Sequence, residues 1–176
     1  PVVCTPLLDR LLGRNAGWPL AAAFLALAVL VVAQAPQVLG RGEALTFSQP
    51  WMPQIGVEFH LRMDGIGLLF TLLVLGIGAV IMAYSTRYFP PGPRLGFYAL
   101  MSLFAFAMTG LVLADDLVLL YVFWELTTLA SFYLIGLSGK AADRPAIRTL
   151  LLTVIGGLTL LGAVVLLIVR TGTTRL

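Results

Sequence analysis

Apolar residues in this chain fall into five runs, each long enough to cross a lipid bilayer. The runs carry almost no charge, and polar or basic segments separate them. A membrane-spanning helix needs about 20 mostly apolar residues, so we predict one helix for each run. The predicted spans lie at about residues 18–35, 65–84, 95–113, 117–137 and 148–169.

The longest polar connection, residues 40–63, has a different pattern. Its last part, residues 57–63 (VEFHLRM), alternates strictly between apolar and polar side chains, which is the period of a strand. Pro50, Pro53 and Gly56 precede it and favour turns. We therefore predict a short strand or hairpin on the membrane surface, in which His60 is structural rather than catalytic.

Composition supports an integral membrane protein. Of 176 residues, 60% are hydrophobic and only 11% are charged, which leaves too little polar surface to cover a soluble globule. The predicted fold class is an all-α membrane protein with one domain over residues 1–176. The chain starts at Pro1 with the short apolar stretch PVVCTPLL, so we expect a fragment that opens with a truncated sixth helix.

The charged and metal-binding residues exclude several kinds of function. Basic residues lie singly or in small groups at the ends of the apolar runs, as topology signals do, so no nucleic-acid partner is expected. Cys4 is the only cysteine and His60 the only histidine, which rules out a disulfide within the chain and a cluster of zinc or haem ligands. We expect no cofactor and no metal site.

Glu125 is the residue that the chemistry of this sequence points to. It lies near the middle of the fourth predicted span, in the segment VFWELTTL, and every other charge lies within a few residues of a span end. A carboxylate at the centre of a membrane helix costs about 2.5–3.5 kcal/mol on insertion scales, so such residues usually mark ion or proton paths. We predict that Glu125 binds and transfers a proton.

The neighbours of Glu125 add polar groups to the same helix face. Tyr121 and Thr128 lie four residues before it and three after it, which makes them candidate neighbours on a proton path. Asp115 and Asp116 stand where this helix begins. We expect both to cap the helix, and the alternative is an ion entrance at its outer end.

The distribution of basic residues predicts an orientation. If the segment before Trp18 is cytoplasmic, more of the basic residues lie on the cytoplasmic side, as the positive-inside rule requires. The turn with Asp115 and Asp116 is then on the outside.

Several separated motifs resemble one family in order and spacing. They are FHLRMDGIGLLFTLLVLGIG, YSTRYF, LADDLVLLYVFWELTTLASFYLIGL and LLTVIGGLTLLG. Together they resemble the large A subunit of multisubunit Mrp-type sodium/proton antiporters, and they are similar to the antiporter-like subunit 5 of respiratory complex I. The segment WELTTLASFYLIG resembles the antiporter version more closely.

The resemblance implies a function for Glu125. In that family a glutamate at the matching position pairs with a lysine on a later, broken helix, and the pair moves protons at the bilayer midplane. Here that lysine and a second repeat are expected beyond Leu176. The implied function is that of a subunit of a monovalent cation/proton antiporter that exports Na⁺, not an enzyme, with the other antiporter subunits and the lipid bilayer as partners. The implied location is the cell membrane, as a multi-pass protein of the bacterial inner membrane.

Two alternatives remain open. The first is a proton-pumping membrane subunit of complex I or of a related membrane-bound hydrogenase. The second is a membrane assembly scaffold that conducts no ion and associates through the small-residue face around Gly156 and Gly157.

Overall fold

Five long helices form the body of the described structure. The computed structural model describes residues 15–40, 42–52, 57–88, 95–137 and 143–175, and five helices in these ranges are long and apolar enough to cross a membrane. They are α2 (Gly17–Ala33, followed by the π-helix η2 at Pro36–Gly40), α3 (Gly65–Tyr88), α4 (Leu95–Leu113), α5 (Leu117–Gly136) and α6 (Asp143–Thr171). The predicted fold class is therefore confirmed for the five full spans. The expected truncated helix lies outside the described residues.

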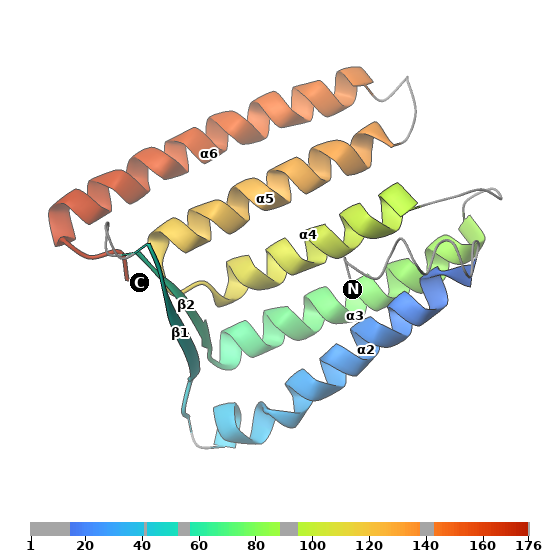
Figure 1. Cartoon of the computed structure of the whole chain (residues 1–176), viewed down its shortest axis with the longest axis horizontal. Coiled ribbons are helices and arrows are strands. Elements are labelled where there is room, and N and C mark those ends of the chain that lie inside the picture. Colours follow the sequence, from blue (N-terminus) through green and yellow to red (C-terminus); the bar gives the residue numbers. More distant parts are fainter. Residues whose placement is uncertain (1–14, 41, 53–56, 89–94, 138–142, 176) are drawn as a thin grey trace.

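The helices pack in chain order, with each one beside the next in a single curved layer (Figure 1). Successive helices run in opposite directions (Figure 1). The start of α3, the end of α4, the start of α5 and the end of α6 consequently gather at one end of the layer. This arrangement brings three polar segments together at that end, namely the hairpin, the α4–α5 turn and the residues after α6.

Some helices extend beyond the predicted spans. The helix α3 continues to Tyr88, α6 already begins at Asp143, and helical backbone follows Pro36 as far as Gly40. Hydropathy detects only the part of a helix that crosses the hydrocarbon, whereas backbone hydrogen bonding continues into the polar interface. Pro36 does not end the helical structure, because proline is tolerated in the first turn of a new helical segment.

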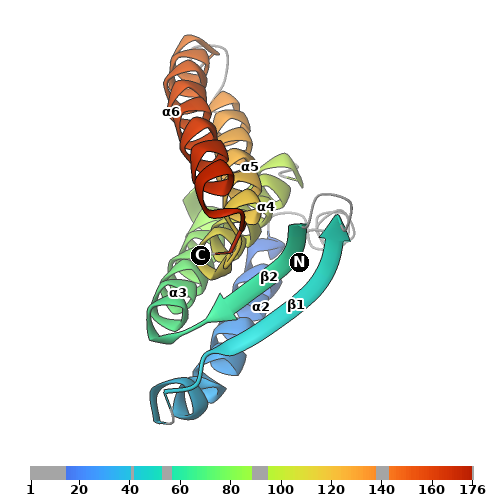
Figure 2. The same ribbon diagram turned by 90° about the vertical axis from the view of Figure 1, so that its left-hand side faces the viewer.

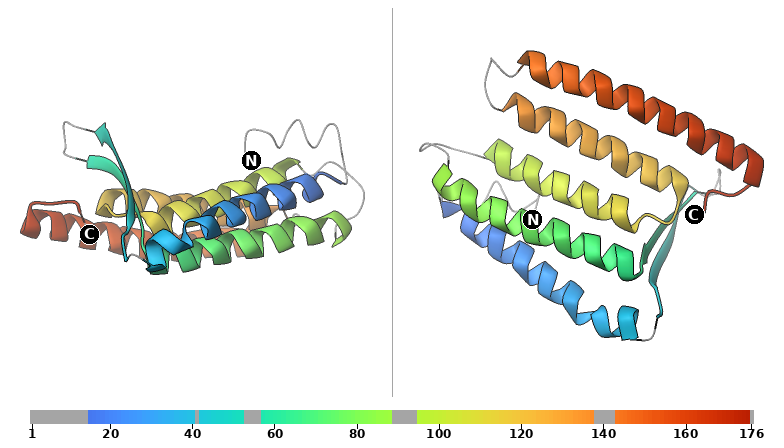
Figure 3. Two further views of the ribbon diagram at one scale, coloured as in Figure 1. Left: turned by 90° about the horizontal axis from the view of Figure 1, so that it is seen from below. Right: turned by 180° about the vertical axis from the view of Figure 1, so that it is seen from behind.

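The predicted hairpin is present and lies across the end of the helical layer (Figure 2). Strand β1 (Leu45–Met52) pairs antiparallel with β2 (Val57–Met63), so that Ser48 faces His60. The view from below shows the hairpin projecting from one face of the layer (Figure 3). Pro50 was expected to form a turn, but it lies within β1, next to a register shift between Pro50 and Met52. Proline fits there because a bulge on an edge strand does not need its missing N–H.

The best-packed region lies among α2, α3 and α4. Leu20, Met82 and Tyr98 are almost completely buried there. Gly78 of α3 makes the approach of α2 possible, since a Cβ atom at this position would lie 2.7 Å from the ring of Phe24. Helix α6 packs against α5 and leaves most of its apolar side chains exposed, which suits a surface that faces lipid or other helices.

Candidate functional site

Glu125 lies in the middle of α5 and faces α6. Its side chain is half-buried, and its carboxylate lies directly against Gly157, which is buried near the middle of α6. A Cβ atom at Gly157 would collide with Oε1 of Glu125. The carboxylate can therefore approach the α6 backbone only because residue 157 has no side chain. The sequence pattern indicates a helix-packing face at Gly157 and gives no link to Glu125.

The two predicted neighbours of Glu125 differ in what they contact. Tyr121 lies one turn before Glu125, and its phenol interacts with the Glu125 carboxylate. Thr128 is buried, but its hydroxyl donates a hydrogen bond to the backbone oxygen of Trp124 at 3.3 Å. The structure thus places Tyr121 beside the acid and directs the Thr128 hydroxyl to its own helix.

No cation balances Glu125 within the residues that the structure describes. The Glu58–Arg175 ion pair and the close approach of His60 to Asp115 both lie at the hairpin end of the molecule. Neither contact reaches the middle of α5, so Glu125 has no charged partner in the part of the chain that the structure describes.

Asp116 is the N-cap of α5. Its Oδ1 atom accepts hydrogen bonds from the backbone N–H groups of Val118 and Leu119 at 2.9 and 3.0 Å, and the side chain is buried. These bonds satisfy two of the amide groups that a helix start leaves without partners. The Asp116 carboxylate therefore caps the N-terminus of α5.

Asp115 faces the hairpin instead of capping the helix. Its Oδ2 atom lies 3.0 Å from Nδ1 of His60, and its backbone N–H donates to the backbone oxygen of His60 at 3.0 Å. Both side chains are largely buried. His60 therefore joins strand β2 to the α4–α5 turn. The spacing of these residues along the chain gave no signal for this contact.

The segment after α6 completes this polar end. The Leu117 N–H donates to the Thr174 oxygen at 2.7 Å, and Arg175 contacts Glu58 of β2 at 2.8 Å. The guanidinium of Arg175 holds the pKa of the Glu58 carboxyl below its usual value, with help from a hydrogen bond donated by Ser48. A polar cavity of about 220 Å³ lies between these segments, and Glu58, His60 and Arg175 are among its lining residues.

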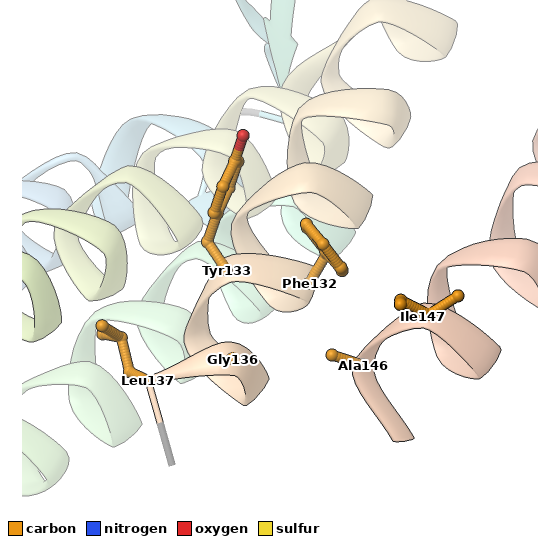
Figure 4. A pocket seen from close by; sticks show the side chains of 6 residues that line it. All are labelled: Phe132, Tyr133, Gly136, Leu137, Ala146 and Ile147. Carbon is orange, nitrogen blue, oxygen red and sulfur yellow. The ribbon is translucent and has the colours of Figure 1, made fainter. Parts of the chain in front are cut away.

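The opposite end of the α5–α6 seam is apolar. A cavity of about 400 Å³ separates the end of α5 from the start of α6 (Figure 4). Its lining residues are Phe132, Tyr133, Gly136, Leu137, Ala146 and Ile147. The only side-chain polar group among them is the Tyr133 hydroxyl, so this cavity offers no ligand set for an ion. The described residues also contain no cluster of three or more His, Cys, Asp or Glu side chains that could hold a metal.

Two family models match successive parts of this chain. Residues 51–96 match the N-terminal region of chain 5 of NADH-ubiquinone oxidoreductase (complex I), and residues 114–176 match the transmembrane region shared by NADH:quinone oxidoreductase and Mrp antiporters. Respiratory complex I from Thermus thermophilus has the same fold, with a TM-score of 0.74 at 22% identity over 99% of this chain and 36% of the other. The chain belongs to this family of antiporter-like membrane subunits.

Within the family, the large subunits of Mrp antiporters are similar to this chain at higher identity. The A1 subunit of the Na⁺/H⁺ antiporter from Staphylococcus aureus (strain JH9) is 46% identical over 124 residues, which are 69% of this chain and 16% of the relative. A chain in the structure of the Mrp complex from Dietzia sp. DQ12-45-1b is 52% identical, with a TM-score of 0.92 over 99% of this chain and 19% of that one. The chain is thus a multi-pass plasma-membrane protein homologous to the large Mrp subunit, and it spans less than a fifth of the length of these relatives.

Proposed function

We propose that this chain is part of the large subunit of a multisubunit antiporter that exchanges a monovalent cation for protons. The homology to the Mrp antiporters supports this proposal more strongly than it supports the complex I alternative, because 52% identity to the Mrp chain contrasts with 22% identity to the complex I chain. The proposed partners are the other antiporter subunits and the surrounding lipid, and the proposed substrates are H⁺ and Na⁺.

In this proposal Glu125 binds and releases a proton during each transport cycle. The observation that carries the proposal is the position of its carboxylate, at the middle of two spans and against Gly157, without a cation among the described residues. A cation that approaches lowers the proton affinity of the acid, and its withdrawal restores that affinity. Tyr121 can take part in proton transfer to Glu125, since its phenol interacts with the carboxylate. The cation belongs to a part of the antiporter outside the described residues.

The test is ion flux through the complete complex with Glu125→Gln. Glutamine keeps the size of the side chain and cannot ionise, so we expect Na⁺-driven proton flux in proteoliposomes to fall to background while the subunits still assemble. Glu58→Gln is a matched control, because Glu58 is an acid on the exposed hairpin. Normal flux through an assembled Glu125→Gln complex would exclude the proposed role and would favour the scaffold alternative.

The complex I alternative rests on the match of residues 51–96 to chain 5 of that enzyme. In this alternative, redox chemistry in other subunits drives proton movement through the same glutamate. The genes next to the one that encodes this chain separate the two functions. Genes for small membrane antiporter subunits support the antiporter, and genes for iron–sulfur and flavin subunits support the respiratory enzyme.

A further inference from the structure

The largest buried side chain of α5 is Phe123, which lies two residues before Glu125. It is 5% exposed, whereas Val122 and Trp124 on either side of it in the chain are 38% and 40% exposed. Successive residues of an α-helix are about 100° apart around the axis, so Phe123 and Glu125 lie on nearly opposite sides of α5 and about 3 Å apart along it. Phe123 therefore packs on the side of α5 that faces away from α6.

Two other rings and a glycine hold the Phe123 ring on that side. Its centroid lies 5.8 Å from that of Phe106 in α4 and 6.3 Å from that of Phe59 in β2, and the two rings of each pair are inclined by 72°. Aromatic pairs prefer such edge-to-face arrangements. A Cβ atom at Gly110 of α4 would collide with the Phe123 ring, so the ring occupies the space that this glycine leaves open. The fit of Phe123 thus depends on two neighbouring elements.

Polar side chains in the span of α5 do not fix its rotation in this way. The hydroxyls of Thr127, Thr128 and Ser131 each donate a hydrogen bond to a backbone oxygen of α5 itself. Bonds within one helix leave its rotation relative to the neighbouring helices free. The rotation of α5 between α4 and α6 consequently depends on packing, and the packing of Phe123 lies at nearly the same level along the helix as Glu125.

We propose that Phe123 is a positioning residue for Glu125. Its fit against Gly110 sets the rotation of α5, and this rotation directs the carboxylate to Gly157. Because both side chains belong to one helix, a turn of α5 at Phe123 moves the carboxylate away from Gly157. Strand β2 contributes to this arrangement through Phe59. The consequence for transport rests on the proposed proton transfer by Glu125.

The first test measures this geometry without ion transport. In the complete complex, cysteines replace Glu125 and Gly157, a short bifunctional thiosulfonate links them, and mass spectrometry measures the linked peptides. Gly110→Ala should lower the linked fraction several-fold, because the new methyl group displaces the Phe123 ring and turns α5. The matched control is Gly78→Ala, which overpacks an aromatic ring between α2 and α3 and should leave the linked fraction unchanged.

The second test is compensation between the two contacting residues. Phe123→Leu leaves a gap beside Gly110 and should also lower the linked fraction. The double variant Gly110→Ala/Phe123→Leu fills this gap with the new methyl group, so linking should exceed that of either single variant. In complexes that keep Glu125 and Gly157, proton flux should follow the same order, with a loss of about fivefold or more in each single variant.

Equal linking in the Gly110→Ala and Gly78→Ala complexes, or no recovery in the double variant, would overturn the proposal. If Gly110→Ala prevents assembly, unchanged linking in Phe123→Leu would overturn it as well. Lower linking in Gly110→Ala with unchanged flux would reject the effect of this position on transport. Lower linking together with normal flux in Glu125→Gln would support the positioning of residue 125 by Phe123 and would reject the proposed proton transfer.

Discussion

The single missing side chain at Gly157 decides how closely Glu125 can approach the neighbouring helix. Gly156, the preceding residue, is exposed and has open space where a Cβ atom would lie. Two adjacent glycines in the same helix therefore have different roles. The carboxylate position depends on one of them and is independent of the other.

This difference yields a matched pair of variants. Gly157→Ala places a methyl group where Oε1 of Glu125 now lies, and the flexible acid must move while the helices remain packed. Because small displacements of a reacting group can lower rates by about 100-fold, we expect proton flux to fall about tenfold or more in an assembled complex. Gly156→Ala should leave flux unchanged. Equal flux for the two variants would show that the contact with Gly157 has no role in transport.

The cap of α5 gives a prediction for stability. Asp116→Ala removes the acceptor for the Val118 and Leu119 amides, and loss of an N-cap costs about 1 kcal/mol, within a range of about 0.5–2 kcal/mol. Hydrogen exchange at these two amides should be several-fold faster than in the unchanged protein. Asp116→Asn keeps an acceptor and should exchange nearly normally. Unchanged exchange in Asp116→Ala would contradict the assignment of the cap.

The positions of the helices follow from the sequence because membrane spans are encoded locally. Each apolar run must satisfy its backbone hydrogen bonds within itself, so length and hydropathy are enough to locate a helix. The strand β2 was predictable for a similar reason, since its alternation is local. Glu125 could be identified from the sequence because a charged side chain in the middle of an apolar membrane span is energetically costly.

Contacts between distant segments could not be predicted in the same way. The approach of His60 to Asp115, the ion pair of Arg175 with Glu58 and the position of Gly157 beside Glu125 depend on how elements pack in space. The sequence identifies the residues but contains no periodicity that pairs them. Asp115 and Asp116 are adjacent in the sequence. Only the structure shows that Asp116 caps α5 and that Asp115 contacts the hairpin.

The packing of α2 against α3 gives a prediction for the helical layer. Gly78→Ala forces the ring of Phe24 to move, and overpacking of this kind costs about 1–3 kcal/mol. We expect a lower thermal unfolding temperature for the complex. Gly76→Ala has open space around the new methyl group and should unfold at the normal temperature. If Gly78→Ala also unfolds at the normal temperature, this close approach does not limit stability.

The polar end of the molecule connects segments that are far apart in the chain. The hairpin contacts the α4–α5 turn through His60 and the residues after α6 through Glu58 and Arg175. These contacts connect the hairpin to the ends of α5 and α6. Glu125 lies near the middle of the same helix pair. The opposite end of that seam has an apolar cavity and no such connection in the described residues.

The Glu58–Arg175 contact should depend on pH in a defined direction. Its pairing lowers the pKa of Glu58, so the contribution of the pair is complete above the usual glutamate pKa and is lost as the pH falls through the lowered value. Distances between spin labels at Gln49 and Thr173 should therefore lengthen only in strongly acidic solution. In Glu58→Gln the distance should not vary with pH. A change near neutral pH would contradict this assignment.

Infrared difference spectroscopy of the complete antiporter complex can show directly whether Glu125 binds and releases a proton. If Glu125 exchanges a proton during transport, addition of Na⁺ should change the intensity of a protonated carboxyl band. That band should be absent in Glu125→Gln and still present in Glu58→Gln. A Na⁺-dependent band that persists in Glu125→Gln, or no band that Glu125 accounts for in an active complex, would contradict the proton-binding role of Glu125.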